Sequence, residues 1–505
     1  MLARNIENSL RGIIRNSPVA PVLRKYFRRS QIEEVLDVGR KQGWEYAANW
    51  IITGQGARFI QSDEFHRIFR NTINTNIEYE YLLTEIRKQL LLSGFEELLD
   101  SGQSTLLGTL ILQAHHNEFV WYISDEEKTR IDAIVAQLQS EDQVSLQVTS
   151  DLILLSMYGR VGQIDNLPLE KHRMLVLNKA NELPLELEEI LVGSIVEYDE
   201  LQEIKTNIKQ LGHIENQTSN QIAQNYEEHP YPRWINWDFP ETGMRIKKLQ
   251  EFYSLDELHF TSRPFDVLIA GCGTGSKAIE CAIGYGDNVK ITAIDLSRTS
   301  LSYAIYMAKK YNIRNIEFMQ MDLLELPKLN KTFDIVECTG VLHHMRDPIE
   351  GGKAIIERVK SKGLVHISLY SELARASIVE LRERYGLTPD MSNDEIRSMR
   401  MLIMKSDAEL LNEGLSLRWD FFDLHRCKDL LFHPLEHRYS IPKIQEMLAM
   451  LNLDFRGLEK PDILRSQYWT RYPSQNDLCS FHKWHEFELR HPDAFGNLYE
   501  IWALK

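Results

Sequence analysis

The feature that most constrains the fold is a change of texture after Pro264. From there, short apolar runs alternate with stretches of helical spacing, and the runs are FDVLIAGCGTG, NVKITAIDL, IEFMQMDLLEL, FDIVECTGVLHHM and KGLVHISLY. Strands that alternate with helices at this pace predict βαβ units and a parallel sheet. LDFRGLE and NLYEIWALK near the end of the chain supply two further strands. The sequence therefore predicts an α/β domain in its second half.

The first 225 residues have a different pattern. Apolar residues recur at helical spacing over 31–51, 78–99 and 104–123, and strand signals are scarce. The stretch ENQTSNQIAQNYEEHPYPRWINW is polar and then rich in proline and aromatics, which predicts a linker followed by an irregular segment. We expect a helical domain over 1–225, which recruits substrate or forms a homodimer. The sheet core follows over 226–372, a helical insertion or lid over 373–440, and completion of the sheet over 441–505.

Composition narrows the function classes. A length of 505 residues predicts two or three domains, and the net charge of -15 disfavours a nucleic-acid substrate. The 5 cysteines form no CxxC pair, which fits reduced thiols and predicts a cytoplasmic protein. No apolar run approaches the ~20 residues of a membrane span. The first 30 residues are basic, which indicates either a solvated helix or an arm for an acidic partner or a membrane surface.

A glycine turn, GCGTG at 271–275, lies between an expected strand and an expected helix, although by itself it is a weak signal that many nucleotide-binding folds share. Glycines there permit positive φ and close approach of the backbone to a ligand. Asp295 ends the next strand, where a carboxylate can accept hydrogen bonds from ribose hydroxyls. Asp322 closes the third strand and can accept from an adenine amine, while Ser297 is the expected N-cap of the following helix. The turn and Asp295 alone would also fit a nicotinamide dehydrogenase.

In order and spacing, FDVLIAGCGTGS, AIDLSRTSLSYA, EFMQMDLLEL and FDIVECTGVLHHM resemble the successive cofactor motifs of class I S-adenosylmethionine-dependent methyltransferases. More narrowly, YEEHPYPRW, SLYSELAR, DLLFHPLEHRYSIPKI and LYEIWALK resemble a bacterial methyltransferase subgroup often fused to tetratricopeptide repeats, as does HHNEFVWYISDEE. The chain carries no recognisable array of such repeats. The resemblance implies a Rossmann-like fold with a seven-stranded sheet, one strand of which is antiparallel.

The resemblance also implies site residues for S-adenosylmethionine and its product S-adenosylhomocysteine. The turn formed by Gly271, Cys272, Gly273, Thr274 and Gly275 would pass under the methionine and ribose portions. The second and third strands would contribute the ribose and adenine contacts, and the fourth strand the contacts along the methionine moiety. These residues are Asp295, Leu296, Ser297, Asp322, Leu323, Thr339 and Gly340.

The acceptor side has several candidates. His343 and His344 follow the fourth strand and are the best-placed bases, although either could instead pack against the cofactor. Tyr370 and Glu372 follow the fifth strand, where Glu372 could equally be a carboxylate at a helix N-terminus. Tyr226 and Tyr231 lie on a proline-stiffened segment and would either shape the acceptor pocket or plug a domain interface, and Glu227, His229 and Trp234 share that segment.

Histidines elsewhere were weighed as metal ligands. His433 and His437 form an HxxxH pair near Glu436, but Pro434 weakens a helix there and no further ligand completes the set. We therefore expect no metal, and a lid held together by these histidines with Asp429 and Arg438. His115 and His116 lie in an apolar helix and are expected to be core or interface residues.

The sequence thus predicts an enzyme that transfers a methyl group from S-adenosylmethionine to a peptide or protein side chain. A small-molecule acceptor is the first alternative. A second is a non-catalytic scaffold that keeps the cofactor fold, although the intact glycines and carboxylates argue against it.

Overall fold

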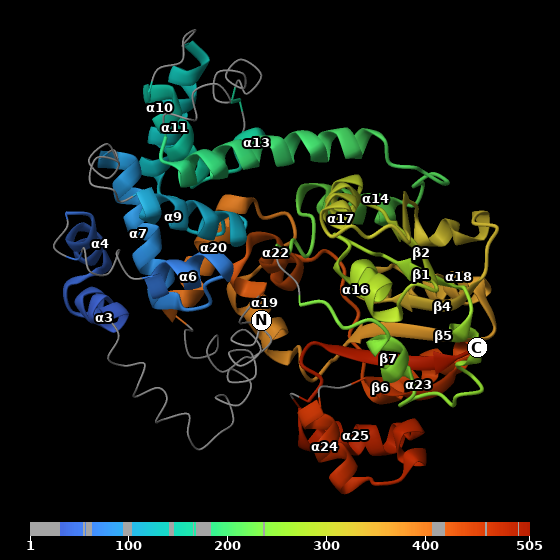
Figure 1. Cartoon of the computed structure of the whole chain (residues 1–505). Helices are drawn as coiled ribbons and strands as arrows, with labels where there is room; N and C mark the ends of the chain where they lie inside the picture. Colours follow the sequence, from blue (N-terminus) through green and yellow to red (C-terminus); the bar gives the residue numbers. More distant parts are fainter. Residues whose placement is uncertain are drawn as a thin grey trace. The chain divides into compact units, whose positions relative to one another are not determined.

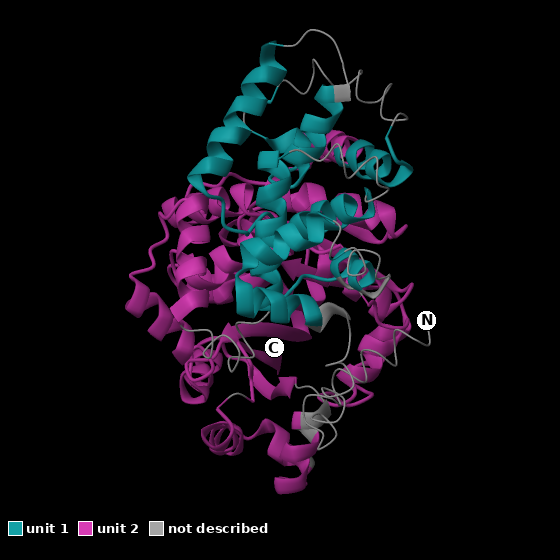
Figure 2. Ribbon diagram, turned by 90° about the vertical axis from the view of Figure 1, so that its left-hand side faces the viewer, with its two compact units in different colours: residues 1–194 teal, residues 195–505 magenta. Residues whose placement is uncertain are grey.

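A computed structural model of the chain describes residues 31–53, 56, 63–93, 104–140, 146–164, 166–167, 183–235, 238–406, 420–459, 462–492 and 494–505. The basic segment before residue 31 lies outside the described residues. The chain divides into two compact units, residues 1–194 and 195–505 (Figure 2). The boundary between the helical region and the sheet domain at residue 225 stays a prediction. In the described part of the chain, every helix is too short or too polar to cross a bilayer.

The first unit is helical in its described residues, as the apolar spacing predicts. Its helices are α3 (Gln31–Gln42), α4 (Trp44–Ile52), α6 (Asp63–Asn71), α7 (Ile77–Ser93), α9 (Ser104–His116), α10 (Asp125–Ser140), α11 (Leu146–Ser156) and η1 (Val161–Gln163). The pattern over 31–51 is two helices, because Gly43 has a φ of 95° and separates them. Helix α9 ends at His116, and Glu118 and Phe119 then adopt positive φ. A long helix, α13 (Leu185–Thr206), crosses from this unit into the second.

The second unit is built on one mixed sheet of seven strands in the order β3-β2-β1-β4-β5-β7-β6 (Figure 1). The strands are β1 (Phe265–Ala270), β2 (Val289–Asp295), β3 (Ile316–Gln320), β4 (Phe333–Cys338), β5 (Val359–Tyr370), β6 (Asp454–Glu459) and β7 (Leu498–Leu504). Strands β1 to β5 pair in parallel, and β7 is antiparallel to both β5 and β6. The predicted seven-stranded Rossmann-like sheet with one antiparallel strand is confirmed.

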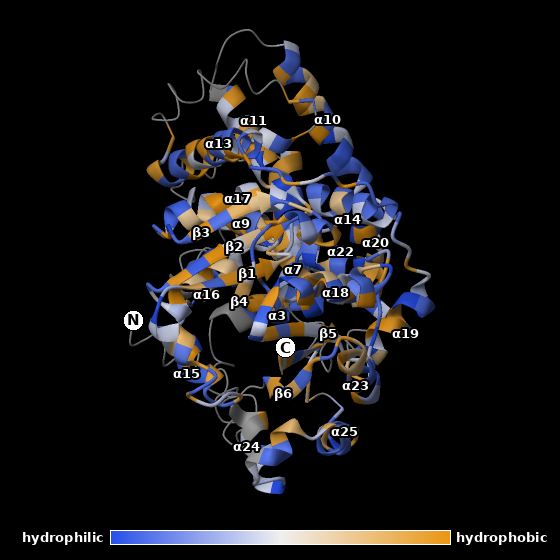
Figure 3. Ribbon diagram, turned by 90° about the vertical axis from the view of Figure 1, so that its right-hand side faces the viewer, coloured by the Kyte–Doolittle hydropathy of each residue, from blue (hydrophilic) through white to orange (hydrophobic). Residues whose placement is uncertain are grey.

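Helices pack on both faces of this sheet, so alternate strand residues enter two different cores. In β1, Val267 and Ile269 join one apolar cluster with helix α16 (Ser276–Tyr285), while Leu268 and Ala270 join another with α18 (Pro348–Arg358) and α23 (Ile441–Met450). Burial of each such side chain stabilises the fold by about 1.5–3 kcal/mol. This double burial explains why the strands read as continuous apolar runs, and Figure 3 shows apolar colouring along β1 and β2.

The remaining helices of the second unit surround the sheet and its carboxyl edge. Those before and between the parallel strands are α14 (Gln217–Glu228), α15 (Met244–Leu249), η3 (His259–Ser262), α16 (Ser276–Tyr285), α17 (Arg298–Lys310), η4 (Leu323–Lys328), η5 (Leu342–His344) and α18 (Pro348–Arg358). Those after β5 are α19 (Ala376–Tyr385), α20 (Asn393–Ser406), η6 (Asp420–Phe422), α22 (Leu424–Phe432), α23 (Ile441–Met450), α24 (Asp462–Arg471), η7 (Gln475–Cys479) and α25 (Phe481–Arg490).

One element corrects the sequence analysis. The expected linker over 215–225 is largely helix α14. Its N-cap is Asn216, whose side chain accepts from the backbone N–H groups of Thr218 and Ser219. This helix is polar in composition because it buries only a narrow face, which includes Ser219, Ile222 and Ala223, and its sequence therefore resembles that of a linker.

Candidate functional site

The turn between β1 and α16 needs its glycines for two reasons. Gly271, Gly273 and Gly275 have φ values of 76°, 51° and 87°, a region that other residues rarely adopt. A Cβ on Gly271 would lie 2.1 Å from Cγ2 of Val341, and one on Gly275 would lie 2.6 Å from Cβ of Ala304. The turn therefore sits close against the loop after β4 and against α17.

Asp295 at the end of β2 faces this turn. Its carboxylate accepts a hydrogen bond from the backbone N–H of Gly273 at 2.7 Å and from that of Ser297 at 2.9 Å. Burial raises the pKa of Asp295, although both hydrogen bonds oppose the rise. The expected N-cap role of Ser297 is confirmed, because its Oγ accepts from the backbone N–H of Ser300 at 3.0 Å.

Two further loops complete this edge of the sheet. Asp322 caps η4, and its carboxylate accepts from the N–H of Leu324 at 3.0 Å, while Leu323 lies beside it. Thr339 and Gly340 directly follow β4. Because β1 and β4 are neighbours whose connections run in opposite directions, this edge is the topological switch point at which open α/β sheets bind ligands.

The aromatic segment before the sheet is fastened to the turn and to α17. The carbonyl of Tyr226 accepts from Oγ of Ser297 at 2.9 Å. The carboxylate of Glu227 accepts from Oγ1 of Thr299 at 2.5 Å and pairs with Lys205 at 2.8 Å. Further along, the carbonyl of Pro232 accepts from Oγ1 of Thr274, and Nε1 of Trp234 donates to the carbonyl of Thr274 at 3.1 Å. Thr274 therefore serves as an anchor for this segment.

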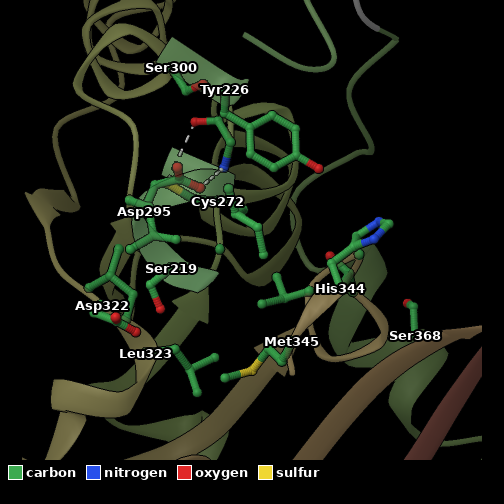
Figure 4. A pocket seen from close by; sticks show the side chains of 18 of the residues that line it. Ser219, Tyr226, Cys272, Asp295, Ser300, Asp322, Leu323, His344, Met345 and Ser368 are labelled. Atoms are coloured by element: carbon green, nitrogen blue, oxygen red, sulfur yellow. Dashed lines mark hydrogen bonds between the residues drawn. The ribbon is translucent and has the colours of Figure 1, made fainter. Parts of the chain in front are cut away.

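A cavity of about 880 Å³ opens among these elements (Figure 4). The predicted site residues in its lining are Gly271, Cys272, Gly273, Asp295, Leu296, Asp322, Leu323, Thr339, Gly340, Tyr226, Tyr231 and His344. Asp295 and Asp322 lie on one side of the view, and His344 and Ser368 on the other. Thr274, Gly275, Ser297, His343 and Glu372 are not part of the lining.

The two adjacent histidines have different surroundings. His344 lines the cavity, and its Nδ1 lies 2.7 Å from the carbonyl oxygen of Leu435. His343 is fully buried and stacks on Tyr370 with ring centroids 3.8 Å apart. Burial lowers the pKa of both histidines, and in His343 the neighbouring His344 adds to the effect. Both imidazoles are therefore neutral near pH 7.

Tyrosines and a carboxylate gather beside these two histidines. The hydroxyl of Tyr226 donates to Oδ1 of Asp429 at 2.8 Å. Burial raises the pKa of Tyr226, Tyr231 and Tyr370 well above the usual value, and Asp429 contributes to each rise. These hydroxyls stay protonated and act as hydrogen-bond donors.

Other predicted residues lie apart from the cavity. Glu372 is half exposed and pairs with Lys443 at 3.0 Å. Glu436 forms a bidentate pair with Arg375 at 2.7 and 3.0 Å, and Nε2 of His437 lies 3.0 Å from the carbonyl of Met345. In the first unit, His116 is buried against the carbonyl of Arg70 at 2.6 Å.

Sequence reasoning missed part of the lining. Helix α14 contributes Ser219 and Ile222, η5 and its following loop contribute Met345 and Arg346, and β5 contributes Ser368. The N-cap Asn216 followed by Thr and Ser was the available signal for α14. Nothing local marks the others, because they enter the lining through long-range pairing.

Comparisons with known proteins agree with this geometry. Residues 267–363 match the family model of a methyltransferase domain. An uncharacterized protein of Synechococcus sp. is 27% identical over 240 residues, which cover 45% of this chain and 57% of that protein. The chain thus spans little more than half the length of this relative. A ubiquinone biosynthesis O-methyltransferase of Rickettsia bellii is 25% identical over 169 residues, which cover 32% of this chain and 68% of the relative.

Solved structures of similar fold are more distant. The structure of PKMT2 from Rickettsia typhi in complex with AdoHcy has 16% identity and a TM-score of 0.39, covering 53% of this chain and 54% of that one. Magnesium protoporphyrin IX methyltransferase from Synechocystis has 14% identity and a TM-score of 0.32, covering 57% and 99%. Likenesses of this size carry no argument about this chain. The domain match agrees with the class I methyltransferase resemblance, while membership of the repeat-fused subgroup stays a prediction.

Proposed function

We propose that this chain is an S-adenosylmethionine-dependent methyltransferase. The observation that carries the proposal is the cavity at the switch point of the sheet, lined by Gly271, Gly273, Asp295 and Asp322 within the segment that matches a methyltransferase domain. In this proposal the glycine turn holds the methionine portion, Asp295 the ribose and Asp322 the adenine. Thr274, Gly275 and Ser297 do not line the cavity, and we propose that they position the glycine turn.

The chemistry asks for positioning more than for acid–base groups. The methyl group of a sulfonium is already activated, so the protein must align the acceptor atom and exclude water. We propose that Tyr226, Tyr231 and His344 contact the acceptor, because all three line the cavity and His344 lies across it from Asp295 and Asp322. Proton acceptance by His343, His344 or Glu372 stays a prediction.

For the acceptor we propose a side chain of a peptide or protein. The support is the separate helical unit of residues 1–194, which adds a folded surface for a macromolecule to the chain. A small-molecule acceptor is the second candidate, and similarity to enzymes named for ubiquinone biosynthesis favours it.

Two measurements test the proposal. Calorimetry with S-adenosylmethionine and S-adenosylhomocysteine should show one site for each on the full chain, with NADH as the matched negative control. Absence of binding by both sulfur compounds would refute the cofactor assignment. Incubation with methyl-labelled donor and a cell lysate should then place the label in acid-precipitable protein, whereas label only in the small-molecule fraction would select the second candidate.

A further inference from the structure

A group of side chains of the kinds that bind metal ions lies beside the cavity. His344 in η5, Asp429 in α22 and His433 at the end of α22 present donor atoms that all lie within 4.8 Å of one another. All three side chains are buried, and His433 has no exposed surface. We call these three residues the histidine–aspartate cluster.

The two imidazoles share one hydrogen-bond partner. The carbonyl oxygen of Leu435 lies 2.7 Å from Nδ1 of His344 and 2.7 Å from Nδ1 of His433. A carbonyl oxygen approaches a ring nitrogen this closely only if that nitrogen carries a proton, because two lone pairs would repel each other. The backbone N–H of Leu435 also lies 3.2 Å from His433 Nδ1, but the shorter contact with the carbonyl, at 2.7 Å, favours a protonated Nδ1. We therefore assign both histidines the tautomer in which Nε2 bears the free lone pair.

The lone pair on Nε2 of His433 accepts no hydrogen bond from the described residues. Among the described residues, its Nε2 has no hydrogen-bond partner, although the atom is buried. A buried polar atom without a partner costs about 1–3 kcal/mol. A carbonyl that orients two imidazoles through Nδ1 is also the arrangement that fixes histidine ligands around metal ions.

Asp429 is held in a similar way. Oδ1 accepts from the hydroxyl of Tyr226 at 2.8 Å, and Oδ2 lies 3.4 Å from that of Tyr370. Each carboxylate oxygen has two lone pairs, so one on each remains available. The nearby guanidinium of Arg375 is paired with Glu436, which offsets its charge. Two neutral imidazoles and one carboxylate therefore carry a single negative charge.

We propose that the histidine–aspartate cluster binds one divalent transition-metal ion through Nε2 of His344, Nε2 of His433 and a carboxylate oxygen of Asp429. Two nitrogens and one oxygen suit Zn²⁺, Fe²⁺ or Co²⁺, whereas Mg²⁺ and Ca²⁺ prefer sites made of oxygen alone. Because His344 also lines the cavity, an open coordination position there is accessible to an oxygen or nitrogen atom of a ligand. The site is independent of methyl-donor binding.

The test uses Co²⁺ on the full chain after removal of metals with a chelator. We expect one Co²⁺ per chain by equilibrium dialysis and a visible absorption band that reports nitrogen and oxygen ligands. His433→Gln and Asp429→Asn each remove a ligand and should weaken Co²⁺ binding at least about 100-fold. Tyr226→Phe, which removes only a hydrogen bond to Asp429, should weaken it about tenfold. His437→Gln, a histidine outside the cluster, should leave it unchanged.

Two outcomes would overturn the metal site. Wild-type protein that takes up no Co²⁺ in dialysis excludes it without any variant. Uptake that His433→Gln and Tyr226→Phe both leave unchanged places the ion elsewhere. Calorimetry with S-adenosylhomocysteine on the same samples keeps the two proposals apart, because its binding tests the methyltransferase site and Co²⁺ uptake tests only the cluster.

Discussion

Two clusters of buried titratable groups lie in the unit of residues 195–505, and they differ in how their charge is compensated. In the Glu337 cluster, which consists of Arg245, Lys277, Glu337, His366 and Glu459, the carboxylate of Glu337 is fully buried between cations. Arg245 contacts both of its oxygens at 2.7 and 2.8 Å, and the hydroxyl of Tyr285 donates at 2.7 Å. Burial would raise the pKa of Glu337, but Arg245 and then Lys277 hold it well below the usual value.

The histidine–aspartate cluster lacks such compensation. Its donors to Asp429 are neutral tyrosines, and burial lowers the pKa of His344 and His433 so that they are neutral as well. In the Glu337 cluster the carboxylate is paired with Arg245 and Lys277, so its charge is compensated without a ligand, although Arg245 Nε and His366 Nε2 have no hydrogen-bond partner among the described residues. The histidine–aspartate cluster leaves a buried nitrogen unpartnered, which is the condition in which a ligand is stabilised. The difference teaches that a buried carboxylate paired with cations stabilises the fold, whereas a buried carboxylate beside neutral imidazoles leaves its charge available to a cation.

The largest expected effect comes from Glu337→Gln. It leaves Arg245 buried without this carboxylate, so the free energy of unfolding should fall by about 3–5 kcal/mol. Urea denaturation monitored by circular dichroism measures this loss. Adding Arg245→Met should restore part of the stability, and a loss below about 1 kcal/mol for the single variant would contradict a structural role.

Asp295→Ala tests whether the cavity binds S-adenosylmethionine through this carboxylate. Asp295 is partly buried, and among the described residues no cation lies in hydrogen-bond contact with it, so we expect its role to lie in ligand binding. The dissociation constant of S-adenosylmethionine should rise about 10- to 100-fold, the equivalent of one charged hydrogen bond. Calorimetry measures the rise, with Asp295→Asn as a variant that keeps the side-chain shape. A change of less than twofold in both variants would contradict the ribose assignment.

The pH dependence of stability separates the two clusters. A histidine whose pKa is lowered on folding contributes stability that is complete above its unfolded pKa of about 6.5 and is lost as the pH falls below it. The pKa of Glu337 is also lowered on folding. This carboxylate therefore contributes stability that is complete above about pH 4.3 and is lost only at more acidic pH.

His433→Gln should therefore flatten the loss of stability between pH 6.5 and 5 by up to about 1.4 kcal/mol per pH unit, the value for one proton. Urea denaturation at stepped pH in the presence of a chelator measures it. Glu337→Gln should leave this window unchanged and flatten the profile below about pH 4.3. The same slope in wild type and His433→Gln would show that His433 does not titrate on unfolding.

The smallest expected loss of stability comes from an ion pair exposed to water, which serves as a reference for the buried pairs. Lys209 and Glu317 form an ion pair at 2.6 Å, but 60% and 54% of their side chains are exposed. Glu317→Gln should cost about 0–1 kcal/mol, and less at high salt. A thermal melt at low and high salt measures it. A cost near that of Glu337→Gln would remove the distinction between buried and exposed charge.

Local signals predicted most of the sheet. The apolar runs after Pro264 located all seven strands, because a strand covered on both faces is apolar at successive positions. The glycines at 271, 273 and 275 predicted the turn for a similar reason, since few residues adopt positive φ. Helix α14 was missed because its buried face is narrow, and its polar residues have the composition of a linker.

The sequence by itself determined where the strands lie along the chain, the glycine turn and the carboxylates at the ends of β2 and β3. Each of these features depends on residues that are close in the sequence. Only the tertiary structure decided which distant side chains meet. It placed His344 beside His433, 89 positions later in the chain, and brought Asp429 to Tyr226. Such meetings depend on how helices after β5 pack at the edge of the sheet, and no local pattern of residues encodes that packing.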